Sequence, residues 1–383
     1  MKRISYSRQS IDESDVQAVA ETLKCDLLTQ GSQITTFEEA LKRYLNVDDV
    51  VVVSSGTAAL HLSYLALNLR GTTVFTSPVT FAATANMLHS VGANVRFVDV
   101  DPKTGLMDVN NLEQVLKETA GDKSISKRAI VPVSLQGIPV NLPAIDNLAQ
   151  YYGVSVVEDA AHSLGGEYVH DQQVYKSASC SHSDLAVLSF HPLKSICCAE
   201  GGAIATRDPD LAHTVRLLRN HGLMRQENSY LRTQKLWGYN YRMTDLQAAL
   251  GVSQLKRLPF FLSKRKAIAN RYYECFQGEP YCHFLTPTPK VLGSAYHLFV
   301  VHFESKEMRD AAYIFLQSHG IETHVHYVPL YKMELYKQWL GEFSLPGAEK
   351  YYQGCLSIPI YPDLSEEDQD YVLEILAKFC NQL

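Results

Sequence analysis

The sequence lacks the segments that would place a protein in or across a membrane. No uninterrupted apolar run approaches the roughly 20 residues that a membrane-spanning helix requires. The N-terminal segment Met1–Tyr6 contains Lys2 and Arg3, but no apolar core follows, so a secretory signal is not indicated. The 8 cysteines include no C-x-x-C pair, and the adjacent Cys197 and Cys198 suit a reducing compartment better than a disulfide framework. We therefore expect a soluble cytoplasmic protein with no membrane partner and no metal site.

Blocks of like charge and nucleotide-binding motifs are also missing. The 35 basic and 41 acidic residues give a formal charge of −6, and neither sign forms a long block, which argues against a nucleic-acid partner. No G-x-G-x-x-G motif follows a strand-like run, and no Walker-type lysine follows Gly56, so dinucleotide and nucleoside triphosphate sites are not favoured. What is present is a chain of 383 residues, 46% of them hydrophobic, which is enough for a large core and more than one domain.

Hydrophobic periodicity predicts an α/β fold in the first two thirds of the chain. Two capping-box patterns predict early helices: Ser10-Ile11-Asp12-Glu13 before a helix to about Lys24, and Thr35-Thr36-Phe37-Glu38 before one to about Tyr44. Short strand-like runs then mostly alternate with helical stretches, at about 50–54, 72–76, 94–98, 128–133, 154–157, 185–190 and 203–206. This alternation predicts a mainly parallel, seven-stranded sheet between helices, and it does not give the strand order.

The pattern changes after Leu250. A long helical stretch continues through about Glu274, and the apolar run Tyr296–Phe303 is typical of a strand. A helix near 306–319, a strand near 321–326 and a final helix from about Ser365 complete the pattern. We expect a large domain over 1–250, whose N-terminal segment helps line the substrate site, and a smaller α+β domain over 251–383.

Two residues suggest a covalent cofactor site. Lys194 lies between the strand-like run ending at Phe190 and the paired Gly201 and Gly202, where a lysine of lowered pKa is placed to form a Schiff base with a cofactor aldehyde. Asp159 ends the β-branched run from Val154, and a carboxylate at the carboxyl end of a parallel strand points into the ligand crevice. By residue type alone, Lys194 is a surface lysine and Asp159 a helix cap; the pair is more specific than either member.

A third segment suggests a phosphate site. Ser54-Ser55-Gly56-Thr57-Ala58 follows four valines and opens a helical pattern that runs to about Leu69. Small residues at a helix N-terminus leave backbone N–H groups free to bind a phosphate. The alternative is an ordinary helix cap made by Ser55 or Thr57.

Together these segments resemble one known family. The chain resembles the fold-type-I, DegT/StrS-type PLP-dependent sugar-nucleotide aminotransferases over essentially its whole length. The resemblance is carried by five segments, in the order Ser55-Gly56-Thr57, Thr80-Phe81-Ala82-Ala83-Thr84-Ala85-Asn86, Glu158-Asp159-Ala160-Ala161-His162, Ser189-Phe190-His191-x-x-Lys194 with Glu200-Gly201-Gly202, and Gly238–Gly251.

The resemblance implies a role for each matching residue. Lys194 would be the catalytic Schiff-base lysine of pyridoxal 5′-phosphate (PLP), and Asp159 the partner of the pyridine nitrogen. His162 would contact the ring hydroxyl, and Phe81 would stack on the ring face. The phosphate would be bound by residues of two subunits: Gly56, Thr57 and Ser189 from one and Asn240 from its neighbour. Six residues fall in segments that would line the sugar-nucleotide site: Tyr6, Gln30, His191, Arg242, His326 and Tyr327.

Residue type alone leaves other roles open for most of these positions. Phe81 also fits a core aromatic, and His162 and His191 fit polar groups at loop bends. The remaining alternatives are Tyr6 as an anchor of the chain terminus, Arg242 as an ion-pair partner, and His326 with Tyr327 as a half-buried strand surface.

The chain also departs from the family pattern. Cys197 and Cys198 stand where threonines are common, and Thr244-Asp245 replaces a more usual Asn-Glu. A thiol is a weaker hydrogen-bond donor than a hydroxyl, so contacts from this loop to the cofactor or lysine are expected to be weaker. Lys194 is retained, whereas family members that dehydrate sugars carry histidine there.

Three segments most resemble the branch of the family in pseudaminic acid biosynthesis: Tyr6–Ile11, Leu28–Gly31 and His324–Tyr331. This resemblance implies amino transfer from L-glutamate to the C4 ketone of UDP-2-acetamido-2,6-dideoxy-4-hexulose, in a homodimer with shared active sites. Alternatives are another acceptor (a UDP-4-keto-pentose or a dTDP- or GDP-linked hexulose), a PLP-binding regulator without turnover, and a phosphate-binding domain without a Schiff base.

Overall fold

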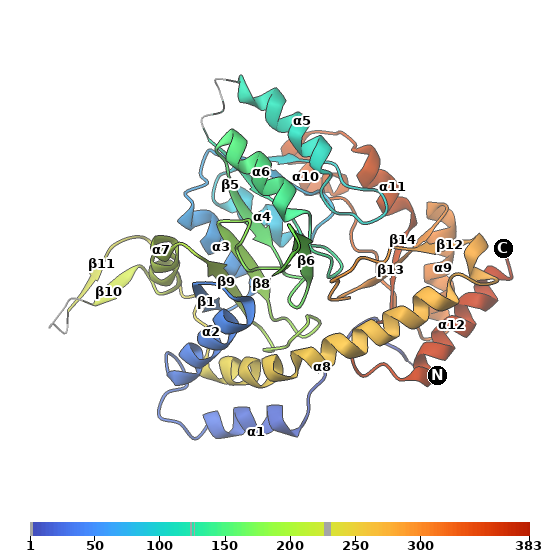
Figure 1. Cartoon of the computed structure of the whole chain (residues 1–383), viewed down its shortest axis with the longest axis horizontal. Helices are drawn as coiled ribbons and strands as arrows, with labels where there is room; N and C mark the ends of the chain where they lie inside the picture. Colours follow the sequence, from blue (N-terminus) through green and yellow to red (C-terminus); the bar gives the residue numbers. More distant parts are fainter. Residues whose placement is uncertain (1–2, 123–124, 126, 226–230) are drawn as a thin grey trace.

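The protein is built around a seven-stranded sheet covered by helices on both faces, with a smaller three-stranded sheet beside it (Figure 1). The structure is a computed structural model, and it describes residues 3–122, 125, 127–225 and 231–383. None of its described helices is both long enough and apolar enough to cross a membrane.

The large sheet has the strand order β1-β9-β8-β5-β4-β2-β3. Its strands, in chain order, are β1 (Asp49–Val53), β2 (Thr73–Thr76), β3 (Asn94–Phe97), β4 (Arg128–Val131), β5 (Ser155–Asp159), β8 (Leu185–Ser189) and β9 (Gly202–Thr206). All neighbouring pairs from β8 to β3 are parallel, and β9 alone runs antiparallel to both of its neighbours, β8 and β1. The predicted mainly parallel, seven-stranded sheet is confirmed.

Alternating side chains of the strands supply the two faces of this sheet. Val51 and Val53 of β1 belong to one hydrophobic cluster, while Val50 and Val52 belong to another, as the two-residue period of a strand requires. The first face packs on α3 (Gly56–Ala66), α4 (Ala83–Ser90) and α7 (Pro209–Arg219). The other face packs on α2 (Ser32–Leu45), α5 (Val109–Ala120), α6 (Leu142–Tyr152) and α8 (Asp245–Cys275).

The C-terminal part forms an antiparallel sheet of β12 (Leu285–Pro287), β13 (Phe299–Phe303) and β14 (Cys355–Ile358). Helices α9 (Lys306–Ser318) and α12 (Glu366–Cys380) share its apolar cluster, and α8 runs along both sheets (Figure 1). The remaining helices are α1 (Glu13–Thr22), α10 (Glu334–Leu340) and α11 (Pro346–Gly354), with 3-10 turns η1 (Tyr281–His283) and η2 (Leu330–Lys332).

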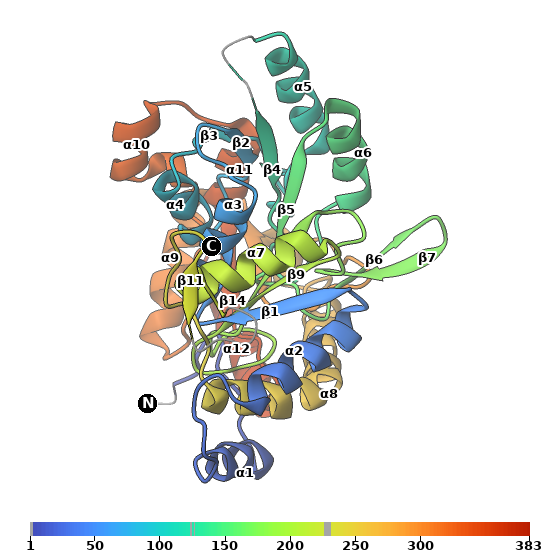
Figure 2. The same ribbon diagram turned by 90° about the vertical axis from the view of Figure 1, so that its left-hand side faces the viewer.

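Two small ribbons project from this body. They consist of β6 (Glu167–His170) with β7 (Gln173–Lys176), and of β10 (Leu223–Arg225) with β11 (Arg232–Gln234). Figure 2 shows the β6–β7 ribbon extending away from the sheet, and Figure 1 shows β10 and β11 extending on the opposite side from the C-terminal helices.

The division between the two predicted domains stays a prediction. Helix α8 bridges residue 250, and Leu330, Tyr336 and Tyr351 pack in the same apolar cluster as Val51 of the large sheet. The C-terminal segment therefore contributes to the core around the large sheet as well as to its own.

Three details of the predicted elements are wrong. Helix α1 is capped by Asp12 in a box with Asp15, because the Ser10 hydroxyl bonds Asp363 instead. Helix α2 begins at Ser32 rather than after Thr35. The segment 321–326 is not a strand: it makes only isolated bridges, from residue 321 to residue 4 and from 324 to 357.

Candidate active site

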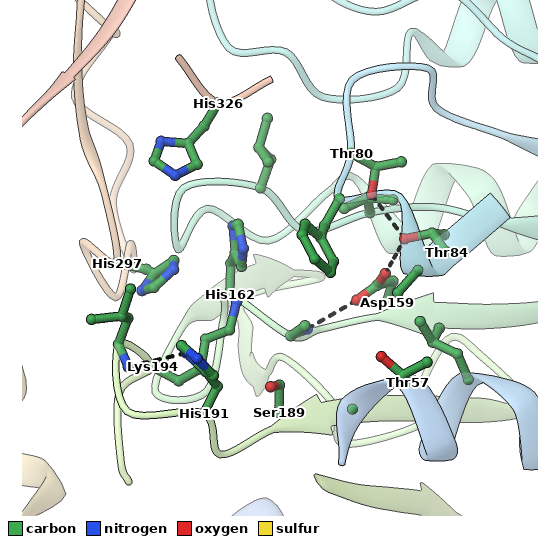
Figure 3. Close-up of a pocket in the computed structure, with 18 of the residues that line it drawn as sticks. Thr57, Thr80, Thr84, Asp159, His162, Ser189, His191, Lys194, His297 and His326 are labelled. Atoms are coloured by element: carbon green, nitrogen blue, oxygen red, sulfur yellow. Dashed lines mark hydrogen bonds between the residues drawn. The ribbon is translucent and has the colours of Figure 1, made fainter. Parts of the chain in front are cut away.

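A cavity of about 490 Å³ opens beside the carboxyl ends of β5 and β8 (Figure 3). The N-terminus of α3, the start of α4 and the loops that follow β4, β5 and β8 line it, and the C-terminal part adds His297, His326 and Tyr327. Because ligands of α/β sheets bind outside the carboxyl ends of the strands, this is the expected place for a site.

Lys194 lies in this cavity, on the loop between β8 and β9. Protein surrounds its amine closely enough that burial lowers the pKa of Lys194 from 10.5 to about 8, and the negative charge of Asp159 opposes part of the shift. An amine with a pKa near 8 is partly neutral at physiological pH, which is the form that attacks a carbonyl and accepts a proton. Lys194 is therefore electrostatically prepared for both steps.

Asp159 ends β5 on the opposite wall of the cavity and is held by two donors. Thr84 donates its hydroxyl to Oδ2 at 2.7 Å, and the backbone N–H of Ala161 donates to Oδ1 at 3.2 Å. Burial raises the pKa of Asp159, whereas these two hydrogen bonds and the charge of Lys194 oppose the rise. A carboxylate has about four acceptor positions, so Asp159 retains capacity for a donor from the cavity.

Two buried imidazoles lie side by side near Lys194. The rings of His162 and His297 have centroids 4.3 Å apart, and the Nδ1 atoms of both lack a hydrogen-bond partner among the described residues. Burial holds the pKa of each well below 6.5, so both rings are neutral at pH 7. The Tyr327 hydroxyl lies 3.3 Å from Nε2 of His162.

Buried Arg265 holds the segment that carries His297. Its guanidinium donates to the carbonyl oxygens of Tyr296 and His297, each at 3.2 Å, and of Ile360 at 3.0 Å. Burial lowers the pKa of Arg265 to about 10. These bonds fix the entry of β13 and with it the His297 ring.

The N-terminus of α3 meets the ends of β8 and β9 with almost no space to spare. A Cβ atom on Gly56 would lie 2.9 Å from Cβ of Ser189, and one on Gly202 would lie 2.5 Å from the carbonyl of Ser55. Ser55 caps the helix by accepting from the N–H of Ala58, as the cap alternative proposed. The preceding N–H groups have no intrahelical acceptor, so the same helix end also fits an anion.

The structure brings most of the predicted site residues together. Those that line the large cavity are Tyr6, Gly56, Thr57, Phe81, Asp159, His162, Ser189, His191, Lys194, His326 and Tyr327. Phe81 is 61% exposed, so it is not the core aromatic that its residue type allowed. The roles assigned to these residues stay predictions.

Three predicted residues lie elsewhere in this chain. Gln30 and Arg242 line a second cavity of about 400 Å³ beside α2 and α7, where Arg242 donates to Oδ1 of Asn220 at 2.6 Å. Asn240 is exposed and pairs through its backbone with Asn220. The position of Asn240 outside the large cavity is compatible with its predicted role in the site of a neighbouring subunit.

Sequence reasoning missed Thr84 and His297. Thr84 lies in a segment that carries the family resemblance and belongs to the first turn of α4, and its hydroxyl is 2.9 Å from that of Thr80, which precedes the helix. His297 was hidden in a strand-like run, because nothing in the spacing distinguishes it from a strand residue.

The departures from the family pattern also find an explanation. Neither Cys197 nor Cys198 lines the large cavity, whereas Cys197 and Lys194 line one small cavity together, and the weaker contacts expected from this loop stay a prediction. Thr244 caps α8 in a box with Gln247, and the Asp245 carboxylate accepts from the N–H groups of Gly31 and Gln33 at the start of α2. Both residues therefore hold helix ends.

Comparison with known proteins places this geometry in a family. The model of the DegT/DnrJ/EryC1/StrS aminotransferase family matches residues 9–377. The chain belongs to this family.

Relatives within the DegT/DnrJ/EryC1/StrS family match the chain over nearly its whole length. The UDP-4-amino-4,6-dideoxy-N-acetyl-beta-L-altrosamine transaminase of Campylobacter jejuni is 37% identical over 97% of this chain and 96% of its own. The Helicobacter pylori protein of the same name is 33% identical over 99% and 98%.

Solved structures of the family have the same fold. Helicobacter pylori PseC, an aminotransferase in the biosynthesis of pseudoaminic acid, superposes with a TM-score of 0.91 at 31% identity over 100% of both chains. A putative sugar aminotransferase of Streptococcus pneumoniae in its PLP form gives 0.88 at 28% identity over 100% and 99%. The predicted fold class and the prediction of an aminotransferase are confirmed, and the family is PLP-dependent.

Proposed function

We propose that the protein transfers an amino group from L-glutamate to the C4 ketone of UDP-2-acetamido-2,6-dideoxy-4-hexulose, with PLP bound at Lys194. One observation carries the proposal: a lysine with its pKa lowered to about 8 shares a cavity with the doubly hydrogen-bonded carboxylate of Asp159. The names of the relatives from Campylobacter jejuni and Helicobacter pylori support this acceptor.

The residues of the cavity fit PLP. The N-terminus of α3 at Gly56 and Thr57, beside Ser189, offers N–H and hydroxyl donors to a phosphate. Buried His162 has an Nδ1 atom without a partner among the described residues, which suits a polar group on the cofactor ring. Asp159 is the acceptor for a protonated ring nitrogen, and the exposed ring of Phe81 is free to stack.

When bound, PLP supplies an electrophilic aldehyde and a ring that withdraws electrons from the α-carbon of the amino donor. Asp159 keeps the ring nitrogen protonated, because an anion adjacent to it favours the charged form. The neutral amine of Lys194 would take the proton from the α-carbon of the amino donor and return it to the carbon that PLP contributes as its aldehyde, on the other side of the transferred nitrogen. Proton transfer by a positioned base contributes about 10²–10⁴-fold to rate.

The neutral histidines complete the site on the side of the C-terminal part. Burial lowers the pKa of His326 to about 3, and its Nδ1 lies 2.8 Å from the Ser357 hydroxyl, which fixes the ring. The Tyr6 ring lies 5.5 Å from that of His326. We assign these two residues to the sugar-nucleotide, since uncharged side chains line the site without repelling an anionic ligand.

The proposal includes a homodimer with shared sites in the cytoplasm. Asn240, Gln30 and Arg242 lie outside the large cavity of their own chain, which is where residues that complete a neighbour's site would be. A monomeric variant that retains full cofactor occupancy would contradict the shared site.

The test follows both products with a panel of acceptors. Purified protein is incubated with L-glutamate and each of four 4-keto sugars: the UDP-linked acetamido sugar, a UDP-4-keto-pentose, a dTDP-hexulose and a GDP-hexulose. We expect 2-oxoglutarate and an amino sugar to form in equal amounts with the first, and Lys194→Ala to abolish both. Turnover with a different acceptor alone would retain the aminotransferase and reject this sugar, and substantial turnover by Lys194→Ala would reject the central assignment.

A further inference from the structure

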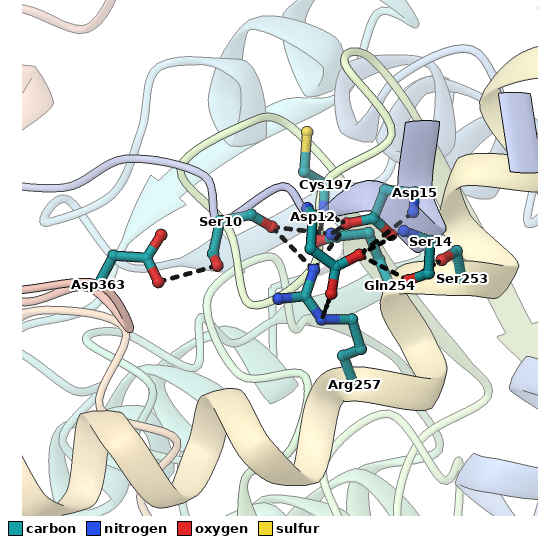
Figure 4. A network of polar contacts seen from close by, with 9 residues as sticks. All are labelled: Ser10, Asp12, Ser14, Asp15, Cys197, Ser253, Gln254, Arg257 and Asp363. Atoms are coloured by element: carbon teal, nitrogen blue, oxygen red, sulfur yellow. Dashed lines mark hydrogen bonds and ion pairs between the residues drawn. The ribbon is translucent and has the colours of Figure 1, made fainter. Parts of the chain in front are cut away.

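A largely buried polar junction contacts the loop that carries Lys194 at Cys197, three residues further along the chain (Figure 4). We call this set, which consists of Ser10, Asp15, Cys197, Gln254 and Arg257, the α1–α8 junction. It joins the N-terminal segment, the first turn of α1, the middle of α8 and the Lys194 loop. None of its members lines the large cavity, so the function proposed above does not use them.

Gln254 is the centre of this junction. Its Oε1 accepts from the backbone N–H of Cys197 at 3.3 Å. Its Nε2 donates to Oδ2 of Asp15 at 2.6 Å and to the carbonyl oxygen of Ser10 at 2.9 Å. Gln254 is 1% exposed, so each of these bonds is shielded from water.

Asp15 determines which way the Gln254 amide points. Oδ2 of Asp15 also accepts from Arg257 at 2.7 Å and from the N–H of Asp12 at 3.1 Å, so this oxygen serves donors only. An amide turned by 180° would place Oε1 against the carboxylate and against the Ser10 carbonyl, and would present N–H₂ to the N–H of Cys197. All three contacts would then be repulsive, so the observed orientation is the one that leaves an acceptor facing Cys197.

The backbone N–H that Gln254 holds belongs to Cys197, three residues after Lys194 in the same loop. Gln254, Cys197 and Lys194 line one small cavity of about 10 Å³, together with Arg265. The N–H of Lys194 bonds the carbonyl oxygen of His191, and the N–H of Cys198 bonds that of Phe190, so the loop closes on itself. A shift at Cys197 would therefore reach the main chain that carries the amine of Lys194.

We propose that Gln254, oriented by Asp15, is a positioning residue that sets the place of the Lys194 amine. This inference rests on the proposed function of Lys194. It assigns to α1, which is distant from the cavity, a part in the reaction through a carboxylate that touches neither substrate nor cofactor.

The test replaces Gln254 by methionine, which has a similar length and no hydrogen-bonding amide. We expect Gln254→Met to lower kcat by about 10- to 100-fold, since a misplacement of about 1 Å at a reacting group can cost about 100-fold. We also expect a shift in the pH at which the absorbance of the lysine-bound cofactor titrates. The matched control is Ser253→Ala, which removes the 3.5 Å contact with Ser14 in the same helix interface without touching the loop; its kcat and titration should remain as in the wild type.

If Gln254→Met does not fold, Asp15→Asn provides a second test of the same contact. Asp15→Asn preserves volume but no longer dictates the amide direction, and we expect the same two changes at smaller size. In the double variant the losses should not add, because both act through one contact to Cys197. Additive losses, or a lowered melting temperature with unchanged kcat and titration in both single variants, would show a purely structural junction and overturn the proposal.

The outcome is separable from that of the proposed function. Reduction of the wild-type holoenzyme with borohydride, followed by peptide mass analysis, reports whether the cofactor is attached to Lys194. An unlabelled Lys194 would reject the proposed function and with it this inference. A labelled Lys194 with wild-type behaviour of the Gln254 and Asp15 variants would reject the inference alone.

Discussion

Replacing Thr84 tests most directly whether Asp159 acts as the ionised partner of the cofactor ring nitrogen. It is buried, and its hydroxyl carries a single hydrogen, which it donates to Oδ2 of Asp159 at 2.7 Å. Thr80 must therefore donate in the 2.9 Å contact between the two threonine hydroxyls. Thr84→Val keeps the shape of the side chain and removes the donor.

The expected size follows from the charge of the acceptor. A hydrogen bond to a charged group contributes about 1.5–3 kcal/mol, which corresponds to about 10- to 150-fold in kcat/KM if the bond is lost in the reactive state. Because the bond from Thr84 lowers the pKa of Asp159, its removal should raise that pKa further. Asp159 would then be protonated, and ineffective toward the ring nitrogen, at a higher pH than in the wild type.

The assay is the pH profile of kcat/KM for amino transfer. We expect activity on the acid side to be lost at a higher pH in Thr84→Val than in the wild type, with an unchanged alkaline side. Thr84→Ser retains the hydroxyl and should restore the wild-type profile, while Thr80→Val should have the smaller effect of an outer contact. A Thr84→Val enzyme with wild-type kcat/KM and acid limb would refute the argument that this bond keeps Asp159 ionised.

Two further predictions concern the lysine and the close packing under it. In Asp159→Asn the pKa of Lys194 should fall below about 8, because the charge of Asp159 raises it. The rate at which apo-protein captures PLP should then reach half its maximum at a lower pH than in the wild type. An unchanged or higher midpoint would contradict this prediction. Gly202→Ala places a Cβ 2.5 Å from the carbonyl of Ser55 and should lower the free energy of unfolding, measured with denaturant, by about 1–3 kcal/mol. The control Gly121→Ala, whose Cβ meets nothing within 4 Å, should leave the free energy of unfolding unchanged. Equal effects of the two variants would count against the packing argument.

The large sheet could be predicted because its strands carry strong local signals. Val50 to Val53 and the β-branched run before Asp159 are short, apolar and bounded by helical patterns, so each strand was placed within a few residues. The predicted start of α1 was wrong for a tertiary reason. Ser10 has the right residue type for a cap, but its hydroxyl is taken by Asp363, which is 353 positions away in the sequence.

The residues of the candidate site also divide into those that the sequence predicts and those that it does not. Lys194 and Asp159 could be predicted because each follows or ends a strand that the sequence pattern identifies, and ligands bind at the carboxyl ends of such strands. The partners that tune them could not: Thr84 reaches Asp159 from the first turn of α4, and His297 reaches His162 from a segment that Arg265 holds. Such contacts depend on how elements pack, which spacing along the chain does not encode.

The positions of Gln30 and Arg242 follow from a contact between two distant motif segments. The Asp245 carboxylate accepts from the N–H groups of Gly31 and Gln33, and a Cβ on Gly31 would lie 2.7 Å from that carboxylate. The contact therefore fixes the segment before α2 against the start of α8 and directs Gln30 and Arg242 into the second cavity. Gln30 and Arg242 therefore lie outside the Lys194 cavity of their own chain, and the shared site proposed above requires a second copy of the chain to bring its own cavity to them.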